Sequence, residues 1–209
     1  MSEVTTDRKF DRLASDEQIA VTQQALNAHN IQTVVVDSSE EARDCVLDLI
    51  PEGAEVHAAM STTLDLIGVT REIEESGRYA AIRPRLRTMD RIKQNREWRK
   101  LASAPDVMLG SVQAVTEQGQ VLVASGGGSQ VGPYASGAGM VIWVVGSQKL
   151  VPTLADGLRR IEEYALPRES ERMRKATGRD SRVNQILIVQ GSLNPNRFKM
   201  IIVKENLGF

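Results

Sequence analysis

Apolar residues recur along the first sixty positions with two spacings, one typical of amphipathic helices and one typical of strands. Ser15 opens a capping-box pattern, and apolar residues follow it at helical spacing. Ile31 to Val36 is a β-branched run that predicts a strand. Ser38 opens a second capping box and a second helix. Ala54 to Met60 predicts the next strand. The apolar stripe of the second helix is Ala42, Cys45, Val46 and Leu49.

Strands and helices therefore alternate in the first half, which predicts a parallel sheet with right-handed crossovers. A third helix is expected from Ser61 to about Gly77, and a fourth from Met89 to Ala102. Beyond Pro105, strands follow one another without helices between them. These strands are expected at Asp106–Gly110, Ser111–Thr116 and Val121–Ser125.

The nearly all-apolar stretch from Met140 to Val145 predicts a central, buried strand. Thr153 is expected to cap a helix. Residues 166–182 are polar and are expected at the surface, and two strands, Gln185–Val189 and Lys199–Val203, end the chain. The predicted fold is α/β: an open, mostly parallel sheet flanked by helices, with an additional antiparallel hairpin region. Residues 1–14 are interpreted as an N-terminal arm and residues 15–209 as a single domain.

Charge is unevenly distributed over the 209 residues, whose net charge is −1. The Arg83–Lys100 segment holds eight basic and two acidic residues. It is either a solvated helix face or a patch for an anionic ligand or an acidic neighbouring subunit. The near-neutral total disfavours a nucleic-acid binder. Arg159 and Arg160, on the late helix, are expected to be a solvated pair, with an inter-subunit contact as the alternative.

The chain has one cysteine, Cys45, so it has no intrachain disulfide. No apolar run approaches the roughly 20 residues of a membrane span, and the N-terminus is polar. A cytoplasmic protein without membrane contact is expected. His29 and His57 lack partners at metal-ligand spacing, so no metal site is expected.

Ser61, Thr62 and Thr63 stand at the start of the third predicted helix. Free backbone N–H groups, the helix dipole and the hydroxyls favour a phosphate or carboxylate there. The alternative is that one of the three residues only caps the helix.

Thr116-Glu117-Gln118-Gly119 is interpreted as a turn between two strands, with Gly119 permitting the reversal. A carboxylate held at a strand end, that of Glu117, is a candidate general base or covalent nucleophile. The alternative is an ordinary exposed glutamate on a surface hairpin.

Gly126, Gly127 and Gly128 form the core of a glycine-rich loop, where the backbone can approach a ligand closely. A flexible surface loop is the alternative. Lys149 follows the buried strand, at the edge where parallel sheets collect ligands, unless it is an ordinary loop lysine.

These segments, in this order, resemble the LUD-domain family of lactate-utilisation proteins. The matching stretches are Ser61-Thr62-Thr63-Leu64 with Gly68, Asp106-Val107 through Gly110, Ala114-Val115-Thr116-Glu117 with Gly119, Val121-Leu122-Val123, Val144-Val145-Gly146, Lys149-Leu150-Val151, Leu154 to Arg160, and Val203 to Phe209. The resemblance covers roughly residues 15–209. Gln118 stands where many members have Thr, and Ala135 to Ala138 where some carry His.

The resemblance implies a fold similar to the sugar-phosphate isomerase and CoA-transferase superfold. In CoA transferases a glutamate before a glycine-containing turn is the nucleophile, and Glu117 occupies a comparable position. Family membership implies a role in lactate or related organic-acid utilisation, beside iron–sulfur subunits carried on other chains.

Two functions follow as hypotheses. One is a cluster-free component of an oxidation system that binds a small anion, with an iron–sulfur oxidoreductase subunit as partner. The other is a stand-alone enzyme of the CoA-transferase or sugar-phosphate isomerase type, using Glu117 and Lys149. The chain alone is expected to bind no cofactor, with CoA or a phosphate-bearing ligand as candidates, and a homo-oligomer is expected.

Overall fold

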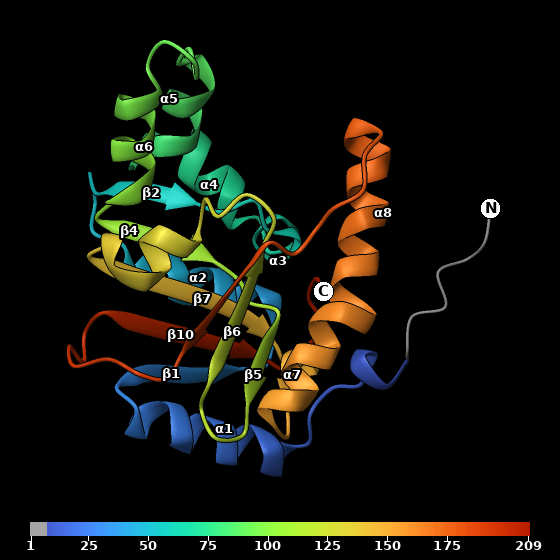
Figure 1. The fold of residues 1–209 in the computed structure, drawn as a ribbon. Helices are drawn as coiled ribbons and strands as arrows, with labels where there is room; N and C mark the ends of the chain where they lie inside the picture. Colours follow the sequence, from blue (N-terminus) through green and yellow to red (C-terminus); the bar gives the residue numbers. More distant parts are fainter. Residues whose placement is uncertain (1–7) are drawn as a thin grey trace.

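The computed structural model describes residues 8–209, and a six-stranded sheet forms the centre of this part of the chain (Figure 1). Each neighbouring pair of its strands is parallel. In spatial order the strands are β1 (Ile31–Val36), β10 (Phe198–Val203), β7 (Met140–Gly146), β4 (Val107–Gly110), β2 (Glu55–Ala58) and β3 (Ala80–Ala81). The predicted α/β fold with a parallel sheet is confirmed, and so is the central, buried place of β7.

A second sheet, four-stranded within residues 8–209, packs across the first (Figure 1). Its strands are, in order, β8 (Leu150–Val151), β5 (Ala114–Thr116), β6 (Val121–Ser125) and β9 (Gln185–Val189). The strands β5 and β6 form an antiparallel hairpin, so the predicted hairpin region is confirmed. Because β8 directly follows the η3 turn after β7, the chain passes from one sheet to the other at Lys149.

Helices cover both faces of the central sheet and project beyond one edge (Figure 1). They are α1 (Asp16–Ala28), α2 (Ser39–Leu49), α3 (Thr62–Leu66), α4 (Val69–Glu75), α5 (Ile82–Thr88), α6 (Asn95–Ser103), α7 (Leu154–Arg160) and α8 (Leu166–Thr177). Shorter helical turns are η1 (Arg8–Asp11), η2 (Pro133–Gly137), η3 (Ser147–Lys149) and η4 (Ile161–Ala165). The segments α7, η4 and α8 follow one another without a gap and form one continuous helical rod, in which η4 is π-helical.

Two hydrophobic clusters lie on opposite faces of the central sheet because strand side chains alternate. On one face Trp143 belongs to a cluster with Leu26 of α1 and Val115 of the hairpin. On the other face Ile142 belongs to a cluster with α2, α3 and α4 residues, Val46 among them. The layers are therefore α1 with the second sheet, then the central sheet, then α2 to α4.

Two helices predicted from the sequence differ in the structure. The third is divided into α3 and α4 because Gly68 adopts a φ of +76°. The fourth begins only at Asn95, because Asp90 Oδ1 accepts hydrogen bonds from the N–H groups of Ile92 and Lys93 and holds a turn there. The preceding helix α5 was not expected, and its Pro84 stands within the first turn, where proline is tolerated.

The end of the chain differs as well. Residues 166–182 contain α8, which buries none of its residues. The two final strands join different sheets, since β9 pairs with β6 while β10 lies between β1 and β7. Burial explains the separation: β10 is almost wholly buried, whereas β9 leaves Gln185 and Ile186 exposed.

Replacement of Ser15 by alanine is expected to lower the free energy of unfolding by about 1 kcal/mol, as loss of an N-cap usually does. Both bonds of the capping box are present, since Ser15 Oγ accepts from the N–H of Gln18 at 3.2 Å and the Gln18 side chain accepts from the N–H of Ser15 at 3.1 Å. Urea unfolding measures the change. Ser38→Ala, at a cap without the return bond, serves as comparison and should lose no more than Ser15→Ala.

Candidate functional site

Lys149 is buried at the point where the chain leaves the central sheet. Its side chain is 1 % exposed. The strand β7 ends at Gly146, where an added Cβ would lie 2.7 Å from the carbonyl oxygen of Glu205 and 2.7 Å from the nitrogen of Leu207. Glycine thus lets the last residues of the chain pass close over β7, and η3 then turns Lys149 into the interior.

Three strand ends supply the groups around the lysine amine. Lys149 Nζ donates to Thr63 Oγ1 at 3.1 Å and lies 3.0 Å from Ser111 Oγ. Thr63 belongs to the first turn of α3, which follows β2, and Ser111 follows β4. The strands β2, β4 and β7 are neighbours in the sheet, so their carboxyl ends bring the three residues together.

The amine has hydroxyl partners and no acid. No carboxylate in residues 8–209 forms an ion pair with Lys149, whose contacts are Thr63 and Ser111. Burial lowers the pKa of Lys149 well below its usual value, and the positive charge of Arg160 lowers it further. Both effects favour the neutral amine over the ammonium form, relative to an exposed lysine.

Arg160 is a second buried cation in the same region. Its side chain is 0 % exposed and its Nη1 donates to the carbonyl oxygen of Gln113. The guanidinium stands 4.8 Å from the centre of the Tyr164 ring, while its Nε and Nη2 have no hydrogen-bond partner. Burial lowers the pKa of Arg160 to about 10, so it stays charged at neutral pH.

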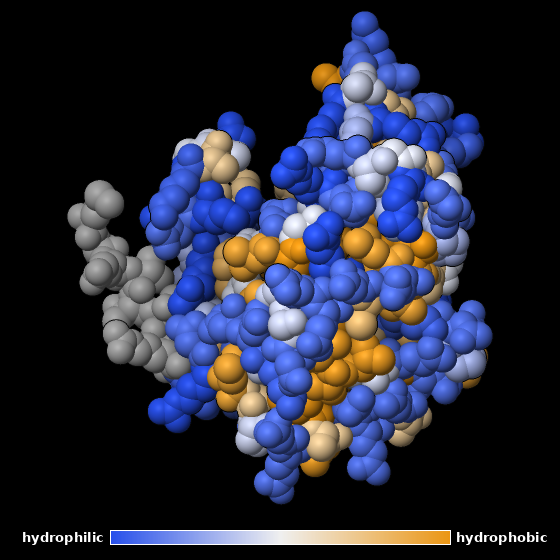
Figure 2. All heavy atoms as spheres, turned by 180° about the vertical axis from the view of Figure 1, so that it is seen from behind, coloured by the Kyte–Doolittle hydropathy of each residue, from blue (hydrophilic) through white to orange (hydrophobic). Residues whose placement is uncertain are grey.

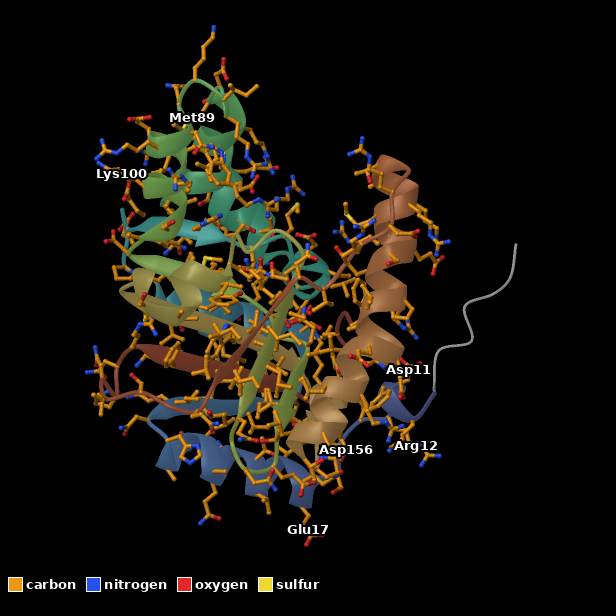
Figure 3. The ribbon with its side chains drawn as sticks, viewed as in Figure 1. Asp11, Arg12, Glu17, Met89, Lys100 and Asp156 are labelled. Atoms are coloured by element: carbon orange, nitrogen blue, oxygen red, sulfur yellow. The ribbon has the colours of Figure 1, made fainter. Side chains whose placement is uncertain are left out.

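The carboxylate whose charge acts on this arginine, that of Asp11, is engaged elsewhere. Asp11 accepts from the hydroxyl of Tyr164 and forms an ion pair with Arg168 at 3.0 Å. Figure 3 shows Asp11 beside the helical rod, near its α7 end. Arg160 therefore keeps two free donor nitrogens inside the protein, where an unpaired polar group is costly.

Comparisons with known proteins identify the family. The sequence profile of the LUD domain matches residues 19–203. The chain belongs to the LUD domain family. The resemblance predicted from the sequence is thus confirmed. A crystal structure of a DUF162 family protein from Deinococcus radiodurans is similar at a TM-score of 0.55 and 14% identity, over 92% of this chain and 99% of that one. At that identity the likeness shows the fold alone. No curated protein matches.

Lys149, Thr63 and Ser111 together are called the lysine cluster. The helix start at Ser61 supplies a helix cap and, through Thr63, one member of this cluster. Ser61 Oγ accepts from the N–H of Leu64 at 3.3 Å, which is the N-cap role. Thr63 joins Lys149, and Thr62 is partly exposed. The structure therefore brings Thr63 and Lys149 together, as neighbours of one candidate site.

Glu117 lies at the other end of the β5 strand from Ser111. Its Oε1 accepts from Gln18 Nε2 of α1 at 3.1 Å. Because Val115 pairs with Leu150, Glu117 is three residues beyond the position opposite Lys149, about 10 Å along the strand. Glu117 and Lys149 have separate partners, and the role of Glu117 as a base or nucleophile stays a prediction.

The turn beside Glu117 is shaped by its contact with α1. Gly119 has a φ of +77°, and an added Cβ would lie 2.9 Å from the carbonyl carbon of Ala25. Thr116 Oγ1 accepts from the N–H of Gln120 at 3.0 Å. Packing of the LUD domain itself thus explains the glycine and the threonine in this turn.

The glycine-rich loop lies at the far end of β6 from Gly119. Gly126 accepts from Asn184 Nδ2 at 2.9 Å, and an added Cβ there would lie 2.8 Å from the carbonyl oxygen of Arg182. Gly128 has a φ of +75° and donates its N–H to Ser125 Oγ at 2.8 Å. An added Cβ on Gly127 meets no atom within 4 Å. Ligand binding by this loop stays a prediction.

The predicted solvated pair Arg159 and Arg160 is wrong for its second member. Arg159 is exposed and pairs with Glu163 at 3.2 Å, whereas Arg160 is fully buried. The buried positions of the rod are Gly157, Arg160, Ile161, Tyr164 and Ala165, spaced i, i+3, i+4, i+7 and i+8. That spacing is a signal in the sequence that places Arg160 on the inner stripe. Ser111 has no comparable signal.

The basic segment Arg83–Lys100 lies on the α5–α6 projection, where Figure 3 labels Met89 and Lys100, and the surface of this projection is mostly hydrophilic (Figure 2). Arg83 and Arg87 both pair with Glu74, at 3.1 and 2.9 Å. Arg91 stands 4.6 Å from the centre of the Trp98 indole ring. Part of the positive charge is therefore satisfied within the domain.

Two further findings concern metals and membranes. Among residues 8–209 the structure holds no group of three or more His, Cys, Asp or Glu side chains arranged to bind a metal ion. In the same residues, no helix combines the length and the apolar character that crossing a membrane requires.

Proposed function

We propose that this LUD domain binds a small organic acid anion of the lactate class at Lys149 and Arg160. The observation that carries the proposal is the burial of two basic side chains, neither of which forms an ion pair with a carboxylate in residues 8–209. Buried charges in proteins are normally paired, because an unpaired one is strongly destabilising. An anionic ligand supplies the missing partner.

The two basic groups suit the two ends of a 2-hydroxy acid. Arg160 offers free Nε and Nη2 donors, and a guanidinium binds a carboxylate through two parallel hydrogen bonds. Lys149 with Thr63 and Ser111 offers an amine and two hydroxyls to the 2-hydroxyl group. The charge of Arg160 lowers the pKa of Lys149, so each basic group acts on the other electrostatically.

The family association with lactate utilisation supports the same ligand class. Cys45 is the single cysteine of the chain, so an iron–sulfur cluster held by four cysteines would come from another subunit. We propose an iron–sulfur oxidoreductase subunit as the partner of this cluster-free component. Anaerobic co-purification from native extract tests the partnership, and recovery of this chain alone would contradict it.

Binding of L-lactate is expected to take up a proton. A bound carboxylate raises the lowered pKa of Lys149, so at a pH between the empty and the liganded pKa the amine becomes protonated. Affinity should therefore increase as the pH falls through that window. Calorimetric titration at one pH in two buffers of different ionisation enthalpy measures the proton uptake.

Lys149→Met should abolish the proton uptake, whereas Lys100→Met, which changes an exposed lysine of α6, should leave it unchanged. Phosphate and CoA are titrated in parallel to distinguish a carboxylate site from a phosphate site. The proposal fails if no carboxylate binds, or if binding is the same in the Lys149 variant and the native protein.

A further inference from the structure

The hydrogen bonds of Lys149 match an amine better than an ammonium ion. An ammonium has three N–H donors, and the structure provides two oxygen acceptors, those of Thr63 and Ser111. Thr63 Oγ1 also donates to the carbonyl oxygen of Leu207 at 3.1 Å, so its proton is used and its lone pair faces the lysine. This leaves Ser111 as the hydroxyl that can exchange a proton with Nζ.

Arg160 and Lys149 lie in environments that suit them to different roles, carboxylate binding for Arg160 and nucleophilic attack for Lys149. Arg160 keeps its charge at neutral pH and has two nitrogens without a hydrogen-bond partner, so it can hold a carboxylate. Burial and the charge of Arg160 lower the pKa of Lys149, which favours its amine form. A lysine that is desolvated beside another cation is the usual form of an amine nucleophile. Ser111 is partly exposed, whereas Thr63 and Lys149 are buried.

Residues Leu207 and Gly208 lie against Thr63 and Gln148. Gln148 Nε2 donates to the carbonyl oxygens of Leu207 and Gly208 at 3.1 and 3.2 Å and so holds these two residues in place. Thr63, which bonds the same carbonyl of Leu207, is thereby fixed against Nζ. The amine is thus positioned by residues that would not react.

We propose that Lys149 forms a Schiff base with a 2-oxo acid whose carboxylate is held by Arg160. This inference rests on the proposed anion site and extends it from the 2-hydroxy acid to the corresponding 2-oxo acid. The reaction class is carbonyl activation, in which hydrogens on the carbon next to the imine become acidic.

The step balances without an oxidant or reductant. The Nζ lone pair attacks carbon 2, and the carbonyl π electrons move to its oxygen. A proton passes from nitrogen to that oxygen through Ser111 Oγ, 3.0 Å from Nζ. The carbinolamine then loses water, and a C=N bond replaces the C=O bond. Hydrolysis reverses the sequence.

The test treats the full chain with pyruvate and sodium borohydride, which reduces an imine to a stable amine. Intact mass and peptide mapping are expected to show one reduced adduct, at Lys149. Lys149→Met should give no adduct and Lys100→Met should give the native yield. Adducts spread over the exposed lysines, or none at Lys149, would overturn the Schiff base.

Calorimetry on the same samples separates this inference from the proposed function. If pyruvate and lactate bind and no adduct forms, the anion site stands and the Schiff base fails. If neither acid binds, both proposals fail.

A second readout tests the proton-transfer role of Ser111. In deuterated buffer the methyl hydrogens of pyruvate should exchange with solvent in the presence of the protein, as followed by NMR. Ser111→Ala should slow the exchange about 100-fold, the usual loss of a proton-transfer group, while pyruvate still binds. Equal exchange rates in Ser111→Ala and the native protein would contradict the proton path.

Discussion

Lys149→Met is expected to abolish binding of a carboxylate ligand and, at the same time, to leave the protein as stable as before or more stable. Loss of a buried charged partner weakens binding by about 3 kcal/mol or more, which is roughly 100-fold in affinity. Stability behaves differently because methionine fills a similar volume without a desolvated amine. Thr63 Oγ1 and Ser111 Oγ, 3.3 Å apart, can still bond each other when the amine is gone.

The pH dependence of stability gives this prediction a sign. The pKa of Lys149 is lowered in the folded protein, so between that value and the ordinary one of about 10.4 the unfolded chain binds the extra proton. Stability of the native protein therefore rises with pH across this window. The methionine variant lacks this contribution, and its stability advantage should shrink as the pH approaches 10.

Urea unfolding of both proteins at several pH values measures the difference. Lys100→Met is the control, since an exposed lysine should change neither stability nor its pH dependence appreciably. A large loss of stability in Lys149→Met, with binding unchanged, would mean that the lysine is a structural residue and not a ligand group.

Local patterns in the sequence were sufficient to predict the strands that precede the candidate site residues. The hydroxyls after β2 were predicted as anion-binding groups because they start a helix, and the lysine after β7 was predicted as a catalytic residue because it follows a strand of a parallel sheet. The pairing of Thr63 with Lys149 was not predictable, since it depends on β4 lying between β2 and β7 in the spatial order. Ser111 enters the cluster for the same reason.

For locating candidate ligand-binding residues, the glycine content of a loop was less informative than the position of a residue at the end of a strand. A glycine beside a turn indicates that something approaches the backbone, but the sequence does not say what does so. At Gly119 the neighbour is the backbone of α1, and at Gly126 it is the carbonyl of Arg182. Arg160 illustrates the opposite case: its charge suggests solvent, whereas its place on the inner stripe of the rod buries it.

Gly110→Ala is expected to destabilise the protein by about 3 kcal/mol and to disturb the lysine cluster. An added Cβ would lie 1.6 Å from Tyr134 Oη and 2.9 Å from its Cζ, so the ring would have to move. Tyr134 is fully buried and packs edge-on against Trp143, with ring centres 5.5 Å apart. Trp143 in turn stacks on Phe198 at 4.8 Å, which leaves the tyrosine ring little room.

The strain at Gly110 reaches the site because Ser111 is the next residue. We therefore expect Gly110→Ala to lower the denaturation midpoint and to weaken ligand binding together. Tyr134→Phe should restore part of the stability, because it removes Oη but keeps Cζ. Gly127→Ala is the matched control, since its added Cβ meets no atom within 4 Å and should change the midpoint little. Equal midpoints for the two alanine variants would show that Tyr134 yields easily, and that the end of β4 is not held by close packing.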